Sequence, residues 1–149
     1  MGCSGLCFEI QQITNPPRVQ MKYLLALVML IASPVWAGWE HVVQSEDGAR
    51  FLINYQTIRK DGNKVKFWQL VNYQKPVTLG EVKYLSTRSR QEYDCKQEQK
   101  RVLTVTAFEN WNADGQVVIK EEETGKWQEI APETVVWEIM KKVCKAPTR

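Results

Sequence analysis

The sequence has few of the residues and motifs from which common catalytic sites are built. It holds a single histidine, His41, and it lacks the G-x-S-x-G, H-E-x-x-H, P-loop and G-x-G-x-x-G patterns that mark hydrolases, zinc peptidases and nucleotide-binding proteins. A metal site or catalytic triad on His41 has no partners that the sequence identifies. The carboxylates show no spacing that singles out an acid–base pair. We therefore expect no enzyme, no metal site and no cofactor.

Strong charge of one sign and a membrane-length apolar run are also absent. The net charge is +3 over 149 residues, which is too near neutrality for a nucleic-acid-binding protein, since that class needs a strongly basic face. The main apolar run, Tyr23–Ala32, is shorter than the roughly 20 residues that cross a bilayer as a helix. We expect no nucleic acid among the partners and no transmembrane segment in the mature chain.

The apolar run lies in a context typical of a secretory signal peptide. It follows Met21-Lys22 and is followed by Ser33–Ala37, in which Val35 and Ala37 occupy the positions where signal peptidase accepts small side chains. Cleavage after Ala37 releases a chain that begins at Gly38.

Three segments follow from this reading. Met21 suits an initiator, so residues 1–20 are expected to be an extension upstream of the true start, and residues 21–37 the signal peptide. Residues 38–149 are long enough for one domain with one core. The exported protein is expected in the periplasm or at the bacterial cell surface.

Only two of the four cysteines, Cys95 and Cys144, lie beyond the signal peptide. Paired thiols persist outside the reducing cytosol, so we expect one structural disulfide that joins the middle of the chain to its C-terminus. A reactive thiol is disfavoured, because redox pairs usually need a C-x-x-C motif or a nearby base. No cysteine lies directly after the apolar run, at the expected cleavage site, so no lipid anchor is expected there.

Short β-type runs separated by turn residues predict an antiparallel sheet. The runs are rich in β-branched and aromatic residues and have short connections. Asp47-Gly48 favours a hairpin turn, a turn is expected at residues 54–58, and Pro76 is expected in a loop. The expected strands are residues 39–44, 49–53, 64–73, 81–95, 101–109 and 116–120.

The only convincing helix follows Pro132, which suits a first helical turn. Its apolar residues recur at helical spacing: Val135, Val136, Ile139, Met140 and Val143. In the fourth strand, alternation places Leu85, Tyr93 and Cys95 on one face. If Cys95 reaches the helix, that face is the covered one. The fold class is therefore α+β, a six-stranded antiparallel sheet with a C-terminal helix packed on one face and tethered by a disulfide.

The best surface patch combines Lys83, Tyr84, Arg88 and Arg90, since arginine and tyrosine are enriched where proteins bind proteins. The alternative is that these cations form cross-strand ion pairs with Glu92 or with neighbouring residues. The acidic run Glu121–Glu123 is expected to be a solvent-facing loop.

The order of these features resembles the bacterial surface-adhesin protein E-like domain family. Its signposts here are Trp39, the Gly48 hairpin, Phe67-Trp68, the run Glu92-Tyr93-Asp94-Cys95, and then Trp127, Pro132 and Cys144. The resemblance covers nearly all of the mature chain and implies the same sheet and disulfide-tethered helix.

For function, the resemblance implies adhesion to a protein ligand. The ligands that the resemblance implies are extracellular-matrix and serum proteins (vitronectin, laminin and plasminogen). It also implies a link with haem and a homodimer. The residues themselves leave two other hypotheses open. One is a periplasmic envelope protein with an endogenous partner, and the other is an enzyme with an unusual site.

Overall fold

The computed structural model describes residues 38–147. The expected extension, signal peptide and cleavage site fall on residues 1–37, outside the described residues.

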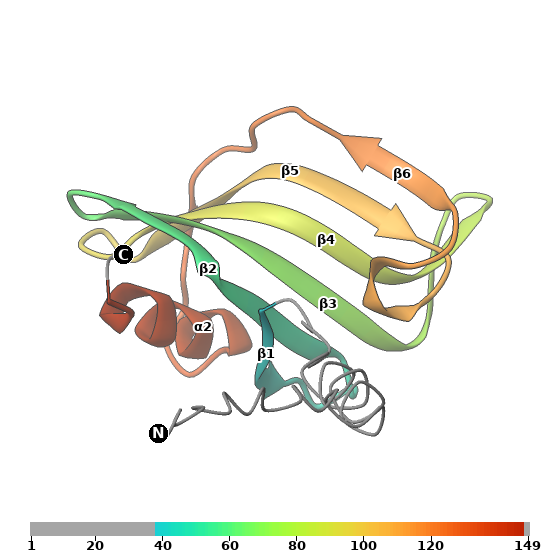
Figure 1. Ribbon diagram of the computed structural model, residues 1–149, viewed down its shortest axis with the longest axis horizontal. Helices are drawn as coiled ribbons and strands as arrows, with labels where there is room; N and C mark the ends of the chain where they lie inside the picture. Colours follow the sequence, from blue (N-terminus) through green and yellow to red (C-terminus); the bar gives the residue numbers. More distant parts are fainter. Residues whose placement is uncertain (1–37, 148–149) are drawn as a thin grey trace, which may run out of the picture. The chain divides into compact units, whose positions relative to one another are not determined.

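The described residues form one antiparallel sheet and one C-terminal helix (Figure 1). Strands β1 to β6 follow one another across the sheet in chain order, and the short β7 pairs with β5. This confirms the predicted six-stranded α+β architecture. The elements are β1 Trp39–Gln44, β2 Arg50–Asp61, β3 Lys64–Leu79, β4 Val82–Asp94, β5 Gln99–Phe108, the 3₁₀ turn η1 Trp111–Ala113, β6 Val117–Glu121, β7 Gln128–Glu129 and α2 Val135–Lys145.

The β1–β2 hairpin turns at Gly48, as Asp47-Gly48 predicts. Gly48 has φ +85°, and its N–H donates to the carbonyl oxygen of Ser45 at 3.0 Å. A side chain there would collide with Gln74, so the position favours glycine for space as well as for conformation.

Strand β2 continues through residues 54–58, where a turn was predicted. The ladder with β3 is interrupted between Asn54 and Arg59, and side-chain bonds replace it. The Thr57 hydroxyl donates to the carbonyl oxygen of Asn54 at 2.6 Å and accepts from the backbone N–H of Trp68 at 3.0 Å. The turn-forming residues therefore make a bulge, which bends the strand without ending it.

Strand β3 likewise extends through Pro76 to Leu79, beyond the predicted end at Tyr73. Pro76 lies inside the interruption of the β3–β4 register between Asn72 and Val77. A missing N–H costs no ladder hydrogen bond at such a position, so the expected loop is the far arm of a long hairpin.

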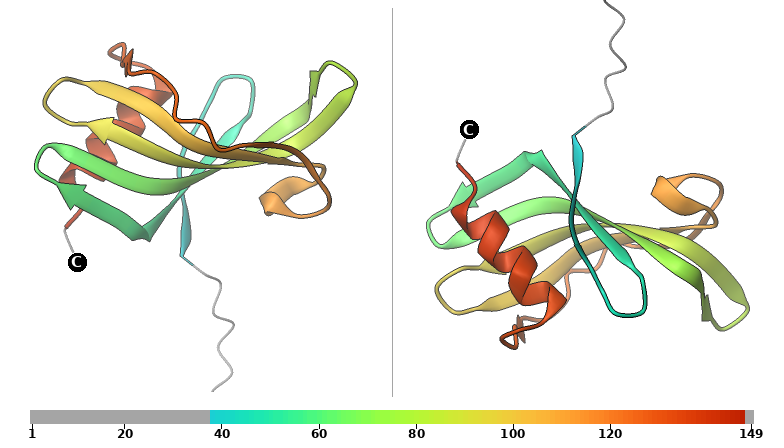
Figure 2. Two further views of the ribbon diagram at one scale, coloured as in Figure 1. Left: turned by 90° about the horizontal axis from the view of Figure 1, so that it is seen from above. Right: turned by 90° about the horizontal axis from the view of Figure 1, so that it is seen from below.

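Helix α2 covers one side of the sheet only (Figure 2). Ile139 and Val143 are fully buried and Met140 nearly so, as the helical spacing predicts. They pack on Ile53 and Phe67 from the sheet. The ring of Phe67 meets that of Tyr93 edge-on, with centroids 5.1 Å apart, so the alternation that places Tyr93 on the covered face is also confirmed.

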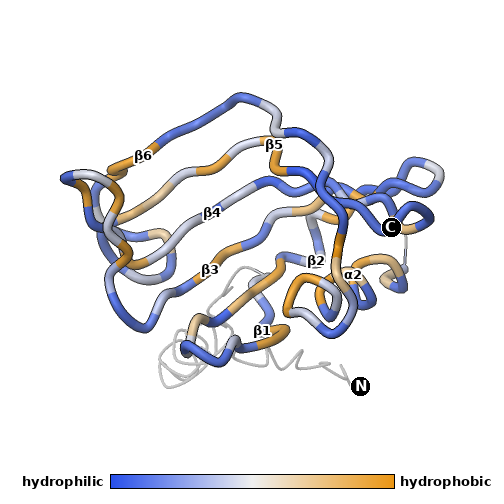
Figure 3. Tube along the Cα trace, turned by 180° about the vertical axis from the view of Figure 1, so that it is seen from behind, coloured by the Kyte–Doolittle hydropathy of each residue, from blue (hydrophilic) through white to orange (hydrophobic). Residues whose placement is uncertain are grey.

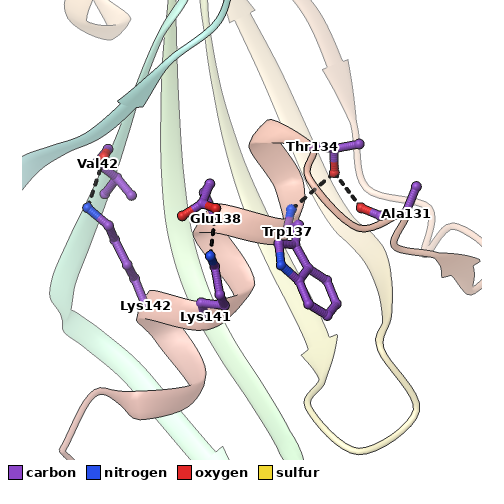
Figure 4. Close-up of polar contacts among 7 residues, drawn as sticks. All are labelled: Val42, Ala131, Thr134, Trp137, Glu138, Lys141 and Lys142. Atoms are coloured by element: carbon purple, nitrogen blue, oxygen red, sulfur yellow. Dashed lines mark hydrogen bonds and ion pairs between the residues drawn. The ribbon is translucent and has the colours of Figure 1, made fainter.

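The helix begins later than Pro132 predicts. Its N-cap is Thr134, whose side-chain oxygen accepts from the backbone N–H of Trp137 at 3.2 Å (Figure 4). Glu133 has φ +61°, which is incompatible with a right-handed helix. Pro132 and Glu133 therefore form the approach to the helix.

Two lysines fix the helix to the sheet. Lys142 donates to the carbonyl oxygen of Val42 at 3.0 Å (Figure 4). Lys60 of β2 donates to the carbonyl oxygen of Cys144 at 2.8 Å, where the helix dipole favours a cation. Cys144 also closes the predicted disulfide with Cys95, with their Cα atoms 5.9 Å apart.

Thr134→Ala is expected to lower the free energy of unfolding by about 1 kcal/mol, because it leaves an N-terminal N–H of the helix without its cap. Urea unfolding followed by circular dichroism measures the change. Thr134→Ser keeps the hydroxyl and should be nearly neutral. Equal losses in both variants would contradict a capping role.

Candidate functional site

The sheet presents two different surfaces. The helix face is the side that α2 covers in part, and the open face is the opposite side, which α2 leaves uncovered (Figure 2). Because side chains alternate along strands, Phe67, Gln69 and Val71 of β3 lie on the helix face. Trp68, Leu70 and Asn72 lie on the open face.

The middle of the open face places Arg88 among aromatic rings. The Arg88 guanidinium carbon lies 5.7 Å from the ring centroid of Trp68 and 5.5 Å from that of Phe108. Arg88 is exposed, and so is Arg90, which pairs across the ladder with Trp68. A guanidinium held over rings is pre-ordered for contact and still carries free N–H donors.

The acidic partner proposed for these arginines is occupied elsewhere. Glu92 is only 2% exposed. Its carboxylate accepts from Arg101 Nε at 2.6 Å and lies 3.5 Å from Lys66 Nζ. Within residues 38–147, Arg88 and Arg90 take part in no ion pair. Their positive charge therefore faces solvent.

The η1 turn covers the far end of the open face. Asn112 N–H donates to Asn72 Oδ1 at 2.8 Å, and Trp111 Nε1 donates to the carbonyl oxygen of Tyr73 at 2.7 Å. The Arg50 guanidinium lies 4.8 Å from the Trp111 ring centroid. Arg50 and Trp111 therefore form a second arginine–tryptophan pair on the open face, like that of Arg88 and Trp68.

Two shallow hollows flank these pairs on the open face. One, of about 370 Å³, lies beside Arg50 and Trp111 and includes His41. The other, of about 410 Å³, lies between Trp39, Trp68 and Arg88. Tryptophan and arginine are the residue types enriched where protein–protein binding energy is concentrated.

The four residues of the predicted patch, Lys83, Tyr84, Arg88 and Arg90, lie in different environments in the structure. Arg88 and Arg90 share the open face. Tyr84 instead meets Tyr73 edge-on, with ring centroids 5.7 Å apart, and lines a hollow with helix-face residues. Desolvation, followed by the nearby Tyr73 hydroxyl, raises the pKa of Tyr84 above its usual value. Lys83 is exposed and pairs with Thr78 near the tip of the β3–β4 hairpin.

Trp68 and Trp111 were not among the predicted site residues. Each faces an arginine from another strand, and the sequence gives no register from which to recognise such a pair. Alternation along the predicted strand 64–73 puts Trp68 on the opposite face of the sheet from Phe67. This was the one sequence signal that could have identified Trp68 as a surface residue of the open face.

The residues considered for catalysis or metal binding remain dispersed. His41 is exposed on the edge strand β1. Residues 38–147 contain no group of three or more histidine, cysteine or carboxylate side chains able to hold a metal ion. None of the helices in this part of the chain has the length and apolar character needed to cross a membrane.

Comparison with known proteins finds one matching family and several solved structures with a similar fold. The family described as surface-adhesin protein E matches residues 39–145. One crystal form of Haemophilus influenzae protein E superposes with a TM-score of 0.58 at 16% identity, covering 72% of this chain and 87% of that one. A second structure of the same protein gives 0.55 at 18% identity, with 76% and 90% covered.

Protein E from non-typeable Haemophilus influenzae gives a TM-score of 0.54 at 17% identity, with 75% of this chain and 78% of that one covered. At these identities the likeness establishes a shared fold. No curated protein matches the sequence significantly.

Proposed function

The chain belongs to the surface-adhesin protein E family, and on that premise we propose that it is an exported, non-enzymatic protein that binds another protein through the open face of its sheet. The partners to test first are vitronectin, laminin and plasminogen. The proposal includes the signal peptide, and so a location in the periplasm or on the cell surface.

One observation carries the proposal. Arg88 and Arg90 are exposed and have no carboxylate partner among residues 38–147, and Arg88 lies over Trp68. Arginine and tryptophan dominate the binding energy of many protein interfaces. An unpaired, pre-ordered guanidinium favours a partner with an acidic surface. Lys83 and Tyr84 stay in the proposal as neighbours at the β3–β4 hairpin.

Arg88→Glu/Arg90→Glu is expected to reduce at least tenfold the affinity for whichever of the three proteins the wild type binds. Binding by the wild type should weaken as the salt concentration rises. Surface plasmon resonance over immobilised vitronectin, laminin and plasminogen measures both effects. The analyte is protein purified from the periplasm of a host that expresses the full-length chain.

Lys96→Glu/Lys145→Glu is the matched control. Both lysines are exposed, lying at the β4–β5 turn and the last turn of α2, and the double change alters net charge equally. Equal losses in the two variants would mean that only overall charge matters and would reject the open face as the site. Binding to none of the three proteins would instead favour a periplasmic role with an endogenous partner.

A further inference from the structure

The η1 turn is held in a strained backbone conformation. The β5–β6 connection that carries it lies at the end of the sheet opposite α2 (Figure 3). Asn112 has φ +61° and Ala113 has φ +58°, in the left-handed region that residues other than glycine rarely adopt. Two successive residues in this region persist only where the surrounding structure holds them, and such strain is concentrated at functional sites.

Two buried polar side chains hold the turn. Asn72 is 4% exposed, and Ser86 is fully buried. Asn72 Oδ1 accepts from the N–H of Asn112 at 2.8 Å. Ser86 Oγ accepts from the N–H of Ala113 at 3.0 Å and donates to the carbonyl oxygen of Asn110. All the hydrogen bonds that these two side chains make within residues 38–147 go to residues 110–113, so both side chains serve to fix the turn.

The same contacts fix the orientation of the Asn112 amide. Because Asn72 Oδ1 accepts from a backbone N–H, the Asn72 amide has only one orientation that satisfies the contact, and its Nδ2 donates to Asn112 Oδ1 at 2.8 Å. Asn112 Nδ2 lies on the other side of its amide from this bond. Asn112 is exposed and lines the hollow of about 370 Å³ beside η1. Its Nδ2 donors are therefore available to a ligand there.

The charges that line this hollow are positive. Arg50 and His41 line it, and the described lining contains no aspartate or glutamate. Neither Arg50 nor His41 takes part in an ion pair within residues 38–147. The Arg50 guanidinium is held over the Trp111 ring, and a guanidinium can bind a carboxylate through two parallel hydrogen bonds. The lining therefore favours a ligand that carries a carboxylate.

The rest of the lining favours a sugar as the carrier of that carboxylate. Trp111 is 39% exposed, and its Nε1 bond to the carbonyl oxygen of Tyr73 fixes the ring, which offers a flat apolar surface to the C–H face of a sugar. The exposed Gln44 amide adds a donor and an acceptor, which suits hydroxyl groups because they need both. The volume lies within the range of small-molecule sites, about 300–1,000 Å³. A rigid sugar ring also loses little conformational freedom when it binds a pre-ordered site.

We propose that this hollow binds a carboxylated sugar, a uronic acid or sialic acid unit of a glycan. Its carboxylate pairs with Arg50 and faces His41. Its hydroxyl groups bond to Asn112 Nδ2 and to the Gln44 amide, and its C–H face packs on the exposed part of the Trp111 ring. The proposal goes beyond the protein contact proposed above and does not depend on it.

Methyl glucuronide and methyl N-acetylneuraminide are the probes, and the one that binds more tightly identifies the kind of acidic sugar. At least one should give saturable shifts of the Asn112 side-chain amide and Trp111 indole N–H signals in ¹⁵N-labelled protein purified after export of the full-length chain. Methyl glucoside has the hydroxyl groups without the carboxylate, and N-acetylglutamate has a carboxylate without the sugar ring. Both should bind at least tenfold more weakly than the preferred acidic sugar.

Asn112→Asp keeps the oxygen that accepts from Asn72 and replaces the free N–H donors with a charged oxygen. It should lower the affinity for the acidic sugar at least tenfold in isothermal titration calorimetry, because like charges repel, and it should change the melting temperature little. Asn110→Asp is the matched control, because it adds the same charge beside η1 but lies outside the lining of the hollow. It should keep the wild-type affinity.

Arg50→Gln should lower the affinity for the acidic sugar at least tenfold and leave the weak binding of methyl glucoside unchanged, since only the carboxylate loses its partner. Arg59→Gln is the matched control, because Arg59 is exposed on the same strand, makes the same change of charge and lies outside the lining. It should leave both affinities unchanged.

Three results would overturn the proposal. They are the absence of a saturable shift with either acidic sugar, equal affinity for N-acetylglutamate, which would assign the hollow to acidic peptide side chains, and full affinity in Asn112→Asp. The Arg88→Glu/Arg90→Glu protein should still bind the acidic sugar, so failure at this site and failure of the protein-binding proposal are distinguishable.

Discussion

Removing the disulfide with Cys95→Ser/Cys144→Ser is expected to lower the free energy of unfolding by about 4 kcal/mol. The two cysteines are 49 residues apart. In the chain-entropy model, a cross-link over a loop of that length lowers the entropy of the unfolded chain and so raises its free energy by this amount. A small domain has a total stability of only about 5–15 kcal/mol. Urea unfolding of the oxidised wild type and of the double variant measures the difference.

Reduction provides the control for this result. Wild-type protein in dithiothreitol should unfold at the same urea concentration as the double variant, and the reductant should not affect the variant. A wild-type midpoint that does not respond to reduction would show that the cross-link contributes little to stability.

Ile139→Ala is expected to lower the free energy of unfolding by about 2–5 kcal/mol, the range for emptying a buried aliphatic site. Ile139 is fully buried between α2 and the sheet, so its truncation loses apolar burial and leaves a cavity. Chemical denaturation monitored by tryptophan fluorescence measures the loss.

Leu79→Ala is the matched control, because it deletes an isomeric side chain that is 58% exposed at the β3–β4 hairpin. Surface truncations of this kind usually change stability by less than about 0.5 kcal/mol. A similar loss at both positions would mean that α2 does not cover a specific core.

The sequence predicts those parts of the fold that follow from periodicity. Alternation identifies the covered face at Tyr93, and helical spacing identifies Ile139 and Val143 as buried. Both signals depend only on the geometry of strands and helices. The disulfide follows from the number of cysteines and the expected oxidising compartment.

Boundaries were predicted less well, because side chains there replace backbone hydrogen bonds. Thr57 maintains β2 through a segment with turn composition, and Thr134 starts the helix after a proline that normally marks its first turn. The two-residue strand β7 is too short to produce a periodic signal.

The candidate sites depend on register, and a single sequence does not provide it. Arg88 and Trp68 meet only because β3 and β4 pair as they do. Alternation places Gln91 on the same face as Tyr93, but only the pairing of β3 with β4 shows that Gln69 and Gln91 are both buried beside one hollow.

The element that covers the core is the last one among the described residues. Phe67 and Tyr93 are synthesised well before their cover, α2, which spans Val135–Lys145. Until that segment is available to fold, the sheet carries a bare apolar surface and Cys95 lacks its partner Cys144. Uncovered surface of this kind attracts chaperones and other unfolded chains. A premature stop codon before Ile139 would therefore leave a chain that is unable to complete this core.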